Sequence, residues 1–510
     1  MTVYRLRINF PNFLITTIAI ALISGCSNEE NKLKSSVVAQ VGDSNISAIE
    51  FRLNYEFGFA HLKIMPDKKR SYLEFMINER LLSLEGYRLG LNKTERLQIL
   101  EERLLEELLV EEMFKIEVDD KIEITPEEIK EAIAKSNVKW KLRYWVEPTI
   151  EASDHLYRSM QELGSGKISQ KNPETGYFTW IDFPPEMLKK IEDLEIGEIS
   201  EPVEYDDLFY LLQVTDIRME GLSDYDYQSA HKRYEQLLFS RKIQEETAKY
   251  VSRFMTPKNV VTKGEEFRIL ADALAEWKEQ VKISVSFSEF LDIAEESNPA
   301  SALLKSHLEN RLITFEDASW SLKDFINRFE PASIKTDPSN KHRYHRELNH
   351  QIAMSIRNHL LAKEAVKRGL DSSSEVQKQL RTWRDKWVYE EMRIFYTKNV
   401  KIDEAVAMNY FEEHKSRYKT AVGIEPTFKE FANQSRQYAY LEESQQLLDQ
   451  KIEALKKEFR VRINQELLDS IVVIDFEKSR WANVLLFKGS SGRLAIPSVD
   501  PAWGWEANYN

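Results

Sequence analysis

Most of the chain carries apolar residues three or four positions apart, the spacing of one face of a helix. The clearest stripe runs from Leu97 to Leu109, where leucines recur at this spacing between glutamates and arginines. Such a stripe predicts an amphipathic helix with one buried face. Glycine and proline are sparse, with 16 and 15 residues in 510. Because both residues break helices, their scarcity also favours a mainly α-helical protein.

The helical pattern occurs twice along the chain. Residues 77–91 and 356–370 align at a constant offset of 279 positions, and each stretch ends in a Gly-Leu pair. The two glycines, Gly90 and Gly369, suit the left-handed conformation that commonly ends a helix. Because order, spacing and end signals are shared, we interpret the stretches as copies of one helical module rather than as unrelated leucine-rich helices.

Each copy begins with a short apolar run followed by a capped helix start. In the first copy Ser47 precedes Glu50 by three positions, and in the second copy Ser321 precedes Asp324 by the same distance. This is the spacing of a capping box, in which each side chain binds the other residue's backbone N–H group. The sequence therefore predicts helix starts after Ser47 and after Ser321.

The region between the copies has a different pattern. Residues 141–146 and 209–215 are rich in aromatic and branched side chains and predict strands, whereas 152–163 and 186–193 predict short helices. This alternation predicts a small α+β domain. The expected fold class is mainly α with one small α+β domain, in which two helical modules are present and the first carries the inserted domain.

The N-terminal segment has the pattern of a secretory signal. Arg5 and Arg7 precede an apolar run over 13–23, which leads through a Ser-Gly pair to Cys26. The run has about 11 residues, too few for a bilayer that needs about 20. A cysteine at this place resembles the lipobox of bacterial lipoproteins, in which the thiol is acylated. We therefore expect lipidation of Cys26; an ordinary secretion signal with a chance cysteine is the alternative.

Two segments of the central domain resemble a known family. Gly197–Val203, which reads Gly-Glu-Ile-Ser-Glu-Pro-Val, is similar to the Gly-Glu-Ile-Ser-x-Pro-Val segment of parvulin-type prolyl isomerases. Glu174–Phe178 resembles the Asp-Leu-Gly-Trp-Phe segment that precedes it in that family. The flanking modules are similar to those of periplasmic chaperone-foldases of the SurA and PrsA kind. The resemblance covers about residues 37–470.

In those foldases a helix that returns from beyond the parvulin domain completes the helical module. The resemblance implies that residues 224–254 complete the first copy. It also implies that residues 442–459, followed by a strand over 461–464, complete the second copy.

The resemblance also identifies candidate site residues. Parvulins carry one histidine on the first strand and another on the last, and the matching positions here are Tyr144 and Tyr210. Tyr177, Phe178 and Met187 could line an apolar pocket for a proline ring. A helix that walls the family's site is expected to be missing between Gly164 and Glu174. Because both histidines are replaced, we expect these side chains to form a core, and peptidyl-prolyl cis-trans isomerase activity stays open.

Charge and composition restrict the remaining functions. With 71 basic and 84 acidic residues, the formal net charge is −13, which argues against nucleic-acid binding through a basic face. A single cysteine excludes a disulfide within the chain. We find no phosphate-binding or nucleophile motif, and His342, His345 and His350 lack further ligands of a metal site. No cofactor and no metal are therefore expected.

The sequence predicts a lipid-anchored extracytoplasmic chaperone that binds unfolded or exported polypeptides. Ser27, where an Asp would favour inner-membrane retention, points by analogy to an outer membrane facing the periplasm. Two alternatives stay open: an active prolyl isomerase, and a structural or assembly lipoprotein of an envelope export machine.

These interpretations divide the chain into segments. They are a signal peptide (1–25), a polar linker (26–36), helical module 1 (37–140), a degenerate parvulin-like domain (141–219), the returning helix of module 1 (220–265), helical module 2 (266–420), the returning helix and strand of module 2 (421–470), and a tail containing Trp, Gly and Pro (471–510).

Overall fold

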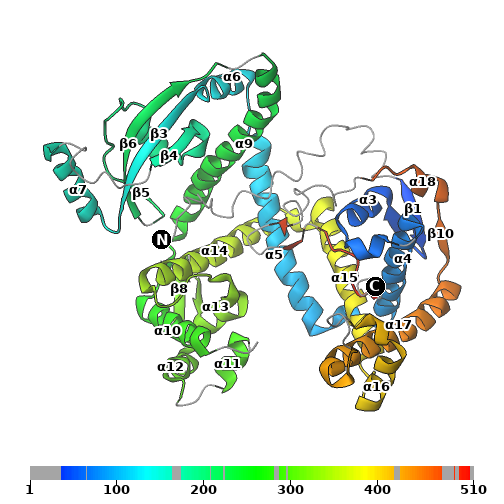
Figure 1. Cartoon of the computed structure of the whole chain (residues 1–510). Helices are drawn as coiled ribbons and strands as arrows, with labels where there is room; N and C mark the ends of the chain where they lie inside the picture. Colours follow the sequence, from blue (N-terminus) through cyan, green and yellow to red (C-terminus); the bar gives the residue numbers. More distant parts are fainter. Residues whose placement is uncertain are drawn as a thin grey trace. The chain divides into compact units, whose positions relative to one another are not determined.

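The chain folds into two compact units. One unit covers Glu117–Tyr250, and the other combines Met1–Ile116 with Val251–Asn510. Cys26 lies outside the described residues, as does the segment 164–173, where the missing wall was expected. The computed structural model (Figure 1) describes residues 36–64, 66–163, 174–206, 208–221, 224–280, 286–293, 297–316, 318–418, 425–473, 487–488, 493–494 and 496–505.

The smaller unit is built on one antiparallel sheet with the strand order β4-β3-β6-β5 (Figure 1). Its strands are β3 (Val138–Glu147), β4 (Glu174–Thr179), β5 (Val203–Tyr205) and β6 (Leu208–Met219). Its helices are α6 (Pro126–Lys135), α7 (Ile150–Leu163), α8 (Pro185–Ile191) and the greater part of α9 (Asp224–Met255). Helices form most of the rest of the described chain, so the predicted fold class, mainly α with a small α+β domain, is confirmed.

This sheet has an apolar core on each face. On one face, Leu142 and Leu212 pack in a cluster with Ile191 of α8. On the opposite face, Trp145 packs with Met160 of α7. Since successive residues of a strand point to opposite sides, β3 and β6 supply both cores, and a side chain's position in the strand decides which core it joins.

The larger unit contains a hairpin and a set of helices from each copy. The strands are β1 (Val37–Val41), β2 (Ser44–Ser47), β8 (Arg311–Phe315) and β9 (Ala318–Ser321). The helices of the first copy are α3 (Ala48–Phe57), η1 (Ala60–Lys63), α4 (Lys68–Arg88) and α5 (Glu95–Glu117). The following helices are α10 (Gly264–Gln280), α11 (Phe287–Ile293), α12 (Pro299–His307), α13 (Leu322–Arg328), α14 (Lys341–Lys367), α15 (Ser374–Thr397), α16 (Glu404–Glu413) and α17 (Phe428–Glu458).

The predicted helix ends are present in both copies. The side chain of Ser47 accepts a hydrogen bond from the N–H group of Glu50 at 3.2 Å. Ser321 forms the full capping box with Asp324. Gly90 and Gly369 have φ angles of 76° and 74°, the left-handed conformation expected where these helices end.

The strand that closes the first copy comes from the far end of the sequence. Strand β10 (Val461–Ile463) pairs with β1, with Ile463 opposite Ala39, and so completes the sheet β10-β1-β2 (Figure 1). We expected this strand to complete the second copy, and that expectation was wrong. The physical reason is side-chain packing: Phe459, Val461 and Leu467 join the core of the first copy.

The helix after the α+β domain also serves a different copy from the one expected. Phe254 and Met255, at the end of α9, pack against the core of the second copy. Strand β7 (Val261–Thr262) then pairs with β8 and forms the sheet β7-β8-β9. The segment over 220–265 was expected to complete the first copy. Its residues up to Tyr250 belong instead to the smaller unit, and its last residues close the second copy. The hairpins β1–β2 and β8–β9 each pair with one further short strand. The sequence of such a short strand does not show which hairpin it pairs with.

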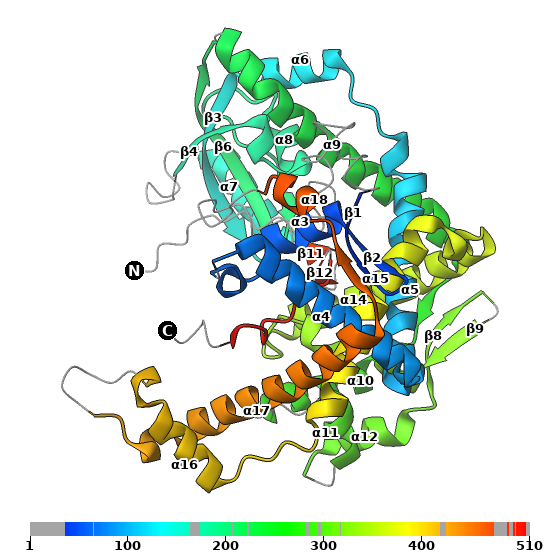
Figure 2. The same cartoon turned by 90° about the vertical axis from the view of Figure 1, so that its right-hand side faces the viewer.

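The two copies share a helix interface in the larger unit. Helix α15 of the second copy packs on α4 of the first and contributes Tyr389 and Met392 to its core. Close approach is possible at Gly86, where an added Cβ atom would lie 2.5 Å from Cγ1 of Val388. Helix α17 (orange) also packs against α4 (blue) in this unit (Figure 2).

The final described segment folds back onto the larger unit. In this segment β11 (Phe487–Lys488) pairs with β12 (Arg493–Leu494). Farther along, Val499 and Trp503 join the core that contains β1, α4 and α15. The described residues around Trp503 therefore pack on the fold.

Candidate functional site

The two tyrosines at the parvulin histidine positions lie on the same face of the α+β sheet. Tyr144 of β3 is opposite Leu212 of β6, and Tyr210 of β6 is opposite Val146 of β3. Tyr144 and Tyr210 are therefore diagonal neighbours, a placement whose Cα atoms lie about 7–8 Å apart. Both side chains are half-buried, and Val146 is 38% exposed. The sheet thus leaves this end of the face partly open.

Phe178 and Met187 lie on the same side of the sheet. Met187 is buried in its core, and Phe178 is partly buried and packs against this core, as Tyr144 and Tyr210 also do. Phe178 is opposite Trp140 and meets the ring of Phe183 edge-on, with 5.9 Å between centroids. Met187 of α8 is 8% exposed. Both side chains therefore fill space between the sheet and its helices, as expected for core residues.

Tyr177 lies on the opposite face. Its neighbour Phe178 faces the core, and adjacent residues in a strand point to opposite sides. The Tyr177 hydroxyl donates a hydrogen bond to the Asp216 carboxylate, and the Arg218 guanidinium lies 4.0 Å from the ring centroid. The hydrogen bond to Asp216 raises the pKa of Tyr177. Tyr177 therefore cannot line one pocket with the other four candidates.

A third tyrosine, which sequence reasoning missed, joins Tyr144 and Tyr210. Tyr205 ends β5 and meets the ring of Tyr210 at 6.3 Å, with 66° between ring planes. The alternation of Val203 and Tyr205 is a local signal for a short strand, but it does not show which strand this one pairs with. We refer to Tyr144, Tyr205 and Tyr210 together as the tyrosine surface.

Burial and a nearby carboxylate act on the hydroxyls of Tyr205 and Tyr210. Burial, with the added negative charge of Asp206, raises the pKa of both Tyr205 and Tyr210. The phenols therefore stay neutral at physiological pH, where each can donate and accept a hydrogen bond. Neutral tyrosines offer apolar ring area and a polar tip, which suits contact with a polypeptide backbone and its side chains.

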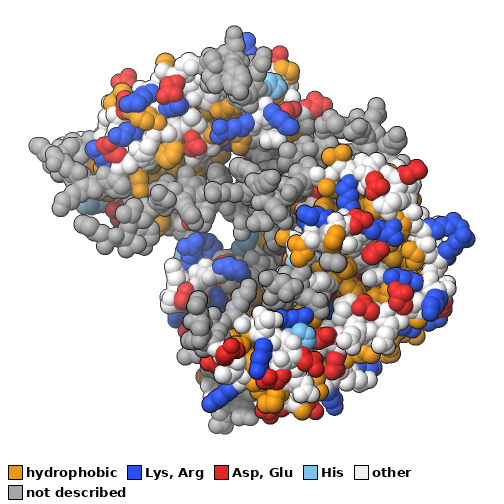
Figure 3. Space-filling model, turned by 45° about the vertical axis from the view of Figure 1, so that its right-hand side comes forward, with side chains coloured by type: hydrophobic (Ala, Val, Ile, Leu, Met, Phe, Trp, Pro, Cys, Tyr) orange, Lys and Arg blue, Asp and Glu red, His pale blue; other side chains and the backbone are white. Residues whose placement is uncertain are grey.

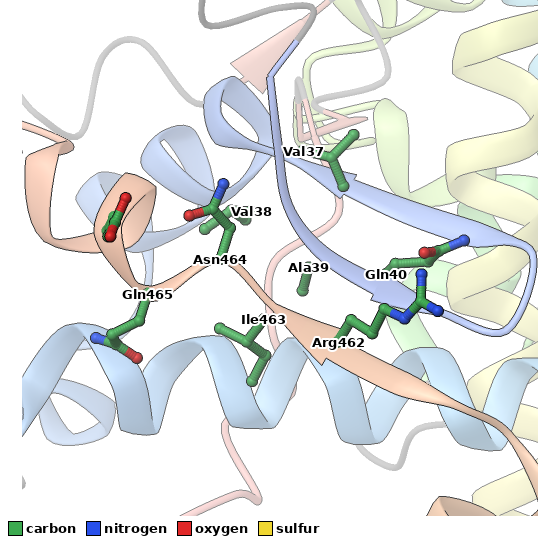
Figure 4. A pocket seen from close by; sticks show the side chains of 9 residues that line it. Val37, Val38, Ala39, Gln40, Arg462, Ile463, Asn464 and Gln465 are labelled. Atoms are coloured by element: carbon green, nitrogen blue, oxygen red, sulfur yellow. The ribbon is translucent and has the colours of Figure 1, made fainter.

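Two surface hollows lie in the larger unit. The first, about 480 Å³ in volume, is lined by residues 37–40 of β1 and 462–466 around β10 (Figure 4). Gln40, Arg462 and Asn464 offer hydrogen bonds there but no nucleophile with a paired base. The second, about 370 Å³, is lined by Ile402, Asn433, Arg436, Gln437 and Tyr440.

The described residues contain no group of three or more His, Cys, Asp or Glu side chains placed to hold a metal ion. None of the helices in the described ranges combines the length and hydrophobicity that a membrane crossing requires. On the face drawn in Figure 3, hydrophobic side chains are interspersed with Lys, Arg, Asp and Glu.

Comparisons with known proteins give limited likeness. No protein-family model matches the chain, and no curated protein matches it. Similar solved structures include the peptidylprolyl isomerase PrsA from Bacillus anthracis, with 15% identity over 35% of this chain and 96% of that one, and a TM-score of 0.19. PrsA from Bacillus cereus has 14% identity over 51% and 99% of the two chains, with a TM-score of 0.19.

The foldase protein PrsA from Lactococcus lactis is similar over 43% of this chain and 93% of that one, with 12% identity and a TM-score of 0.19. At such identities and TM-scores we base the assignment of function on the residues of this chain and not on the likeness.

Proposed function

We propose that the chain is a membrane-anchored extracytoplasmic chaperone that binds unfolded or exported polypeptides. The tyrosine surface carries this proposal. Tyr144, Tyr205 and Tyr210 are half-buried at the partly open end of a rigid sheet. Tyrosines supply large contact areas at low entropic cost, because each has only two side-chain torsions to fix. Such a surface suits many different unfolded sequences rather than one ligand.

We further propose that prolyl isomerisation is weak. The reaction must lower a rotation barrier of about 18–20 kcal/mol, which requires an apolar pocket and hydrogen bonds aimed at the twisting amide. Of the candidates for such a pocket, Met187 is buried in the core, Phe178 meets the ring of Phe183 there, and Tyr177 faces the other side of the sheet. The remaining tyrosines offer binding area without an enclosing wall of candidate residues.

The proposed location follows from the N-terminal sequence. Acylation of Cys26 would tie the chain to the cell envelope, and Ser27 favours an outer membrane facing the periplasm. Clients would then be chains that have just been exported and expose apolar segments.

Two assays on the intact chain test the function. In the first assay, the chain should suppress aggregation of an unfolded outer-membrane protein at near-equimolar ratio. In the second, the isomerisation rate of a short proline peptide with the chain present should be only slightly above the uncatalysed rate. Strong isomerisation that disappears in Tyr210→Ala would instead support an active isomerase. Failure to suppress aggregation, together with stable co-purification of one envelope protein, would support an assembly lipoprotein.

A further inference from the structure

The segment Val499–Trp505 lies in a groove of the larger unit. The walls of this groove, called here the tail groove, are Leu62 of η1, Phe75 and Glu79 of α4, Tyr389 and Arg393 of α15, and Tyr438 of α17. We propose that the tail groove is a peptide-binding site. Its ligand class is a turn-forming segment with an acidic residue followed, three and five positions later, by two aromatic residues. The chain's own segment, whose residues 501–504 form turns, occupies the groove as an intramolecular ligand.

The acidic position of the ligand is held by charge and hydrogen bonds. The Asp500 carboxylate pairs with the Arg393 guanidinium and accepts a hydrogen bond from the Tyr389 hydroxyl at 2.9 Å. Its other oxygen accepts the N–H group of Ala502 at 2.8 Å, which fixes a turn in the segment. A carboxylate held by a guanidinium in a largely buried place is a specific contact, because a neutral side chain would leave Arg393 without this partner.

The first aromatic position is the most enclosed. The indole of Trp503 stacks between Phe75, at 6.0 Å, and Tyr389, at 6.4 Å, and Trp503 is 2% exposed. Its Nε1–H group donates to Glu79 Oε1 at 3.2 Å. Two ring walls with a hydrogen-bond acceptor at the end make a pocket that accepts tryptophan in full and phenylalanine only in part.

The second aromatic position has its own walls. Gly504 adopts a φ of 60°, and this left-handed turn directs the next residue toward α17. Trp505 then packs 5.8 Å from the Tyr438 ring and 5.4 Å from the Arg417 guanidinium. Trp505 is 4% exposed, so both tryptophans are removed from water.

The groove also binds the backbone of the segment. Glu79 Oε1 accepts the N–H group of Asp500 at 2.6 Å, and Lys386 pairs with the same carboxylate at 2.8 Å. On the other side His61 Nε2 lies 2.8 Å from the carbonyl oxygen of Pro501. These contacts come from helices that are not continuous with the segment, and the described residues of the segment pair with no strand. The segment therefore meets the unit as a bound peptide would.

This inference rests on the proposed function in one respect: the competing ligands would be aromatic-rich stretches of unfolded clients. The binding site itself can be tested without any client. The probe is a fluorescent peptide with the sequence of residues 496–507, and the target is the full chain with Trp503→Ala and Trp505→Ala, which vacates both pockets.

We expect the vacated chain to bind the peptide at least about tenfold more tightly than the wild-type chain does. The reason is that a tethered segment competes at an effective concentration on the order of millimolar. Peptides carrying Asp500→Asn or Trp503→Ala should bind more weakly, and Arg393→Met in the vacated chain should abolish the preference for Asp. Equal affinity of wild-type and vacated chains, or no binding by a folded vacated chain, would overturn the proposal.

A second measurement covers the case in which the double variant does not fold. In hydrogen exchange of the wild-type chain, the amides of Ala502 and Trp503 should exchange through local opening, well before the core amides of α4. If they exchange only with global unfolding, the segment is a fixed part of the core and the proposal is wrong. Peptide exchange without any aggregation suppression would leave the groove intact and refute only the chaperone function.

Discussion

At the residue scale, Glu85 of α4 links two helices that are far apart in sequence. Its side chain is 2% exposed and pairs with Lys451 of α17 at 3.0 Å and with Arg88 at 2.6 Å. Burial alone would raise the pKa of Glu85, but the hydrogen bonds from Arg88 and Lys451 outweigh burial and hold the pKa below its ordinary value. Ionised Glu85 therefore stabilises the folded state.

The sign of the pH dependence follows from the lowered pKa. The stabilisation by Glu85 is complete above the unfolded-state pKa of about 4.5 and is lost as the pH falls through the lower folded-state value. We expect Glu85→Gln to lower the free energy of unfolding at pH 7 by about 1–3 kcal/mol. The deficit relative to wild type should shrink below about pH 4, as measured by denaturant titration at several pH values. A deficit independent of pH would contradict the assignment.

Two glycines near the end of α4 should behave differently on substitution. At Gly86 any larger side chain meets Val388, so Gly86→Leu should cost about 3 kcal/mol by forcing α4 and α15 apart. At Gly90 there is open space, and Gly90→Ala should cost only about 1 kcal/mol for the left-handed backbone. Thermal or denaturant unfolding measures both. Equal costs would mean that the helices do not approach closely at Gly86.

At the element scale, local sequence signals were sufficient to predict most helices and strands. They were insufficient to predict which of these elements pair or pack with one another. Capping residues and glycines lie within a few positions of the ends that they specify, so Ser47, Ser321, Gly90 and Gly369 predicted helix ends correctly. The partner of β10 depends on which core accepts its side chains, and that depends on the whole fold.

The same limit applies to the candidate site. Alternation in strands already implies that Tyr177 and Phe178 face opposite sides, so their separation could have been predicted. The inclusion of Tyr205 could not, because it requires the pairing of β5 with β6 that brings Tyr205 against Tyr210.

The closing strand can be tested by cross-linking. In a Cys26→Ala background, Ala39→Cys with Ile463→Cys should form a disulfide on mild oxidation, because these residues are opposite each other in β1 and β10. The matched control is Ile313→Cys with Ile463→Cys, since Ile313 has the corresponding place in β8 and faces Thr262 instead. Gel mobility under non-reducing conditions reads out the result. Cross-linking in the control alone would support the original expectation that β10 completes the second copy.

At the scale of the whole molecule, β1 of the first copy pairs with a strand that follows it by more than 400 residues. The α+β domain and the second copy lie between these two strands in sequence. The first sheet can therefore form fully only after nearly the whole chain has been synthesised. Long sequence separation between contacting strands slows folding.

The proposed anchor makes a separate prediction at this scale. Cys26→Ala should move the protein from the membrane fraction to the soluble fraction, because the lipid would be its attachment. The described fold begins after residue 35, so the released protein should keep the wild-type melting temperature and aggregation suppression. Cell fractionation and thermal unfolding measure both. Retention in the membrane would contradict lipid anchoring through Cys26.

The most direct test of the central claim compares client binding by two variants of the same sheet. Tyr144→Ser with Tyr210→Ser removes two rings from the tyrosine surface, whereas Tyr177→Ser removes a half-buried ring from the opposite face. The measurement is the dissociation constant for an unfolded outer-membrane protein, with the fold checked by circular dichroism. We predict at least about tenfold weaker binding for the double variant and little change for Tyr177→Ser. Equal binding by both folded variants and wild type would contradict the account.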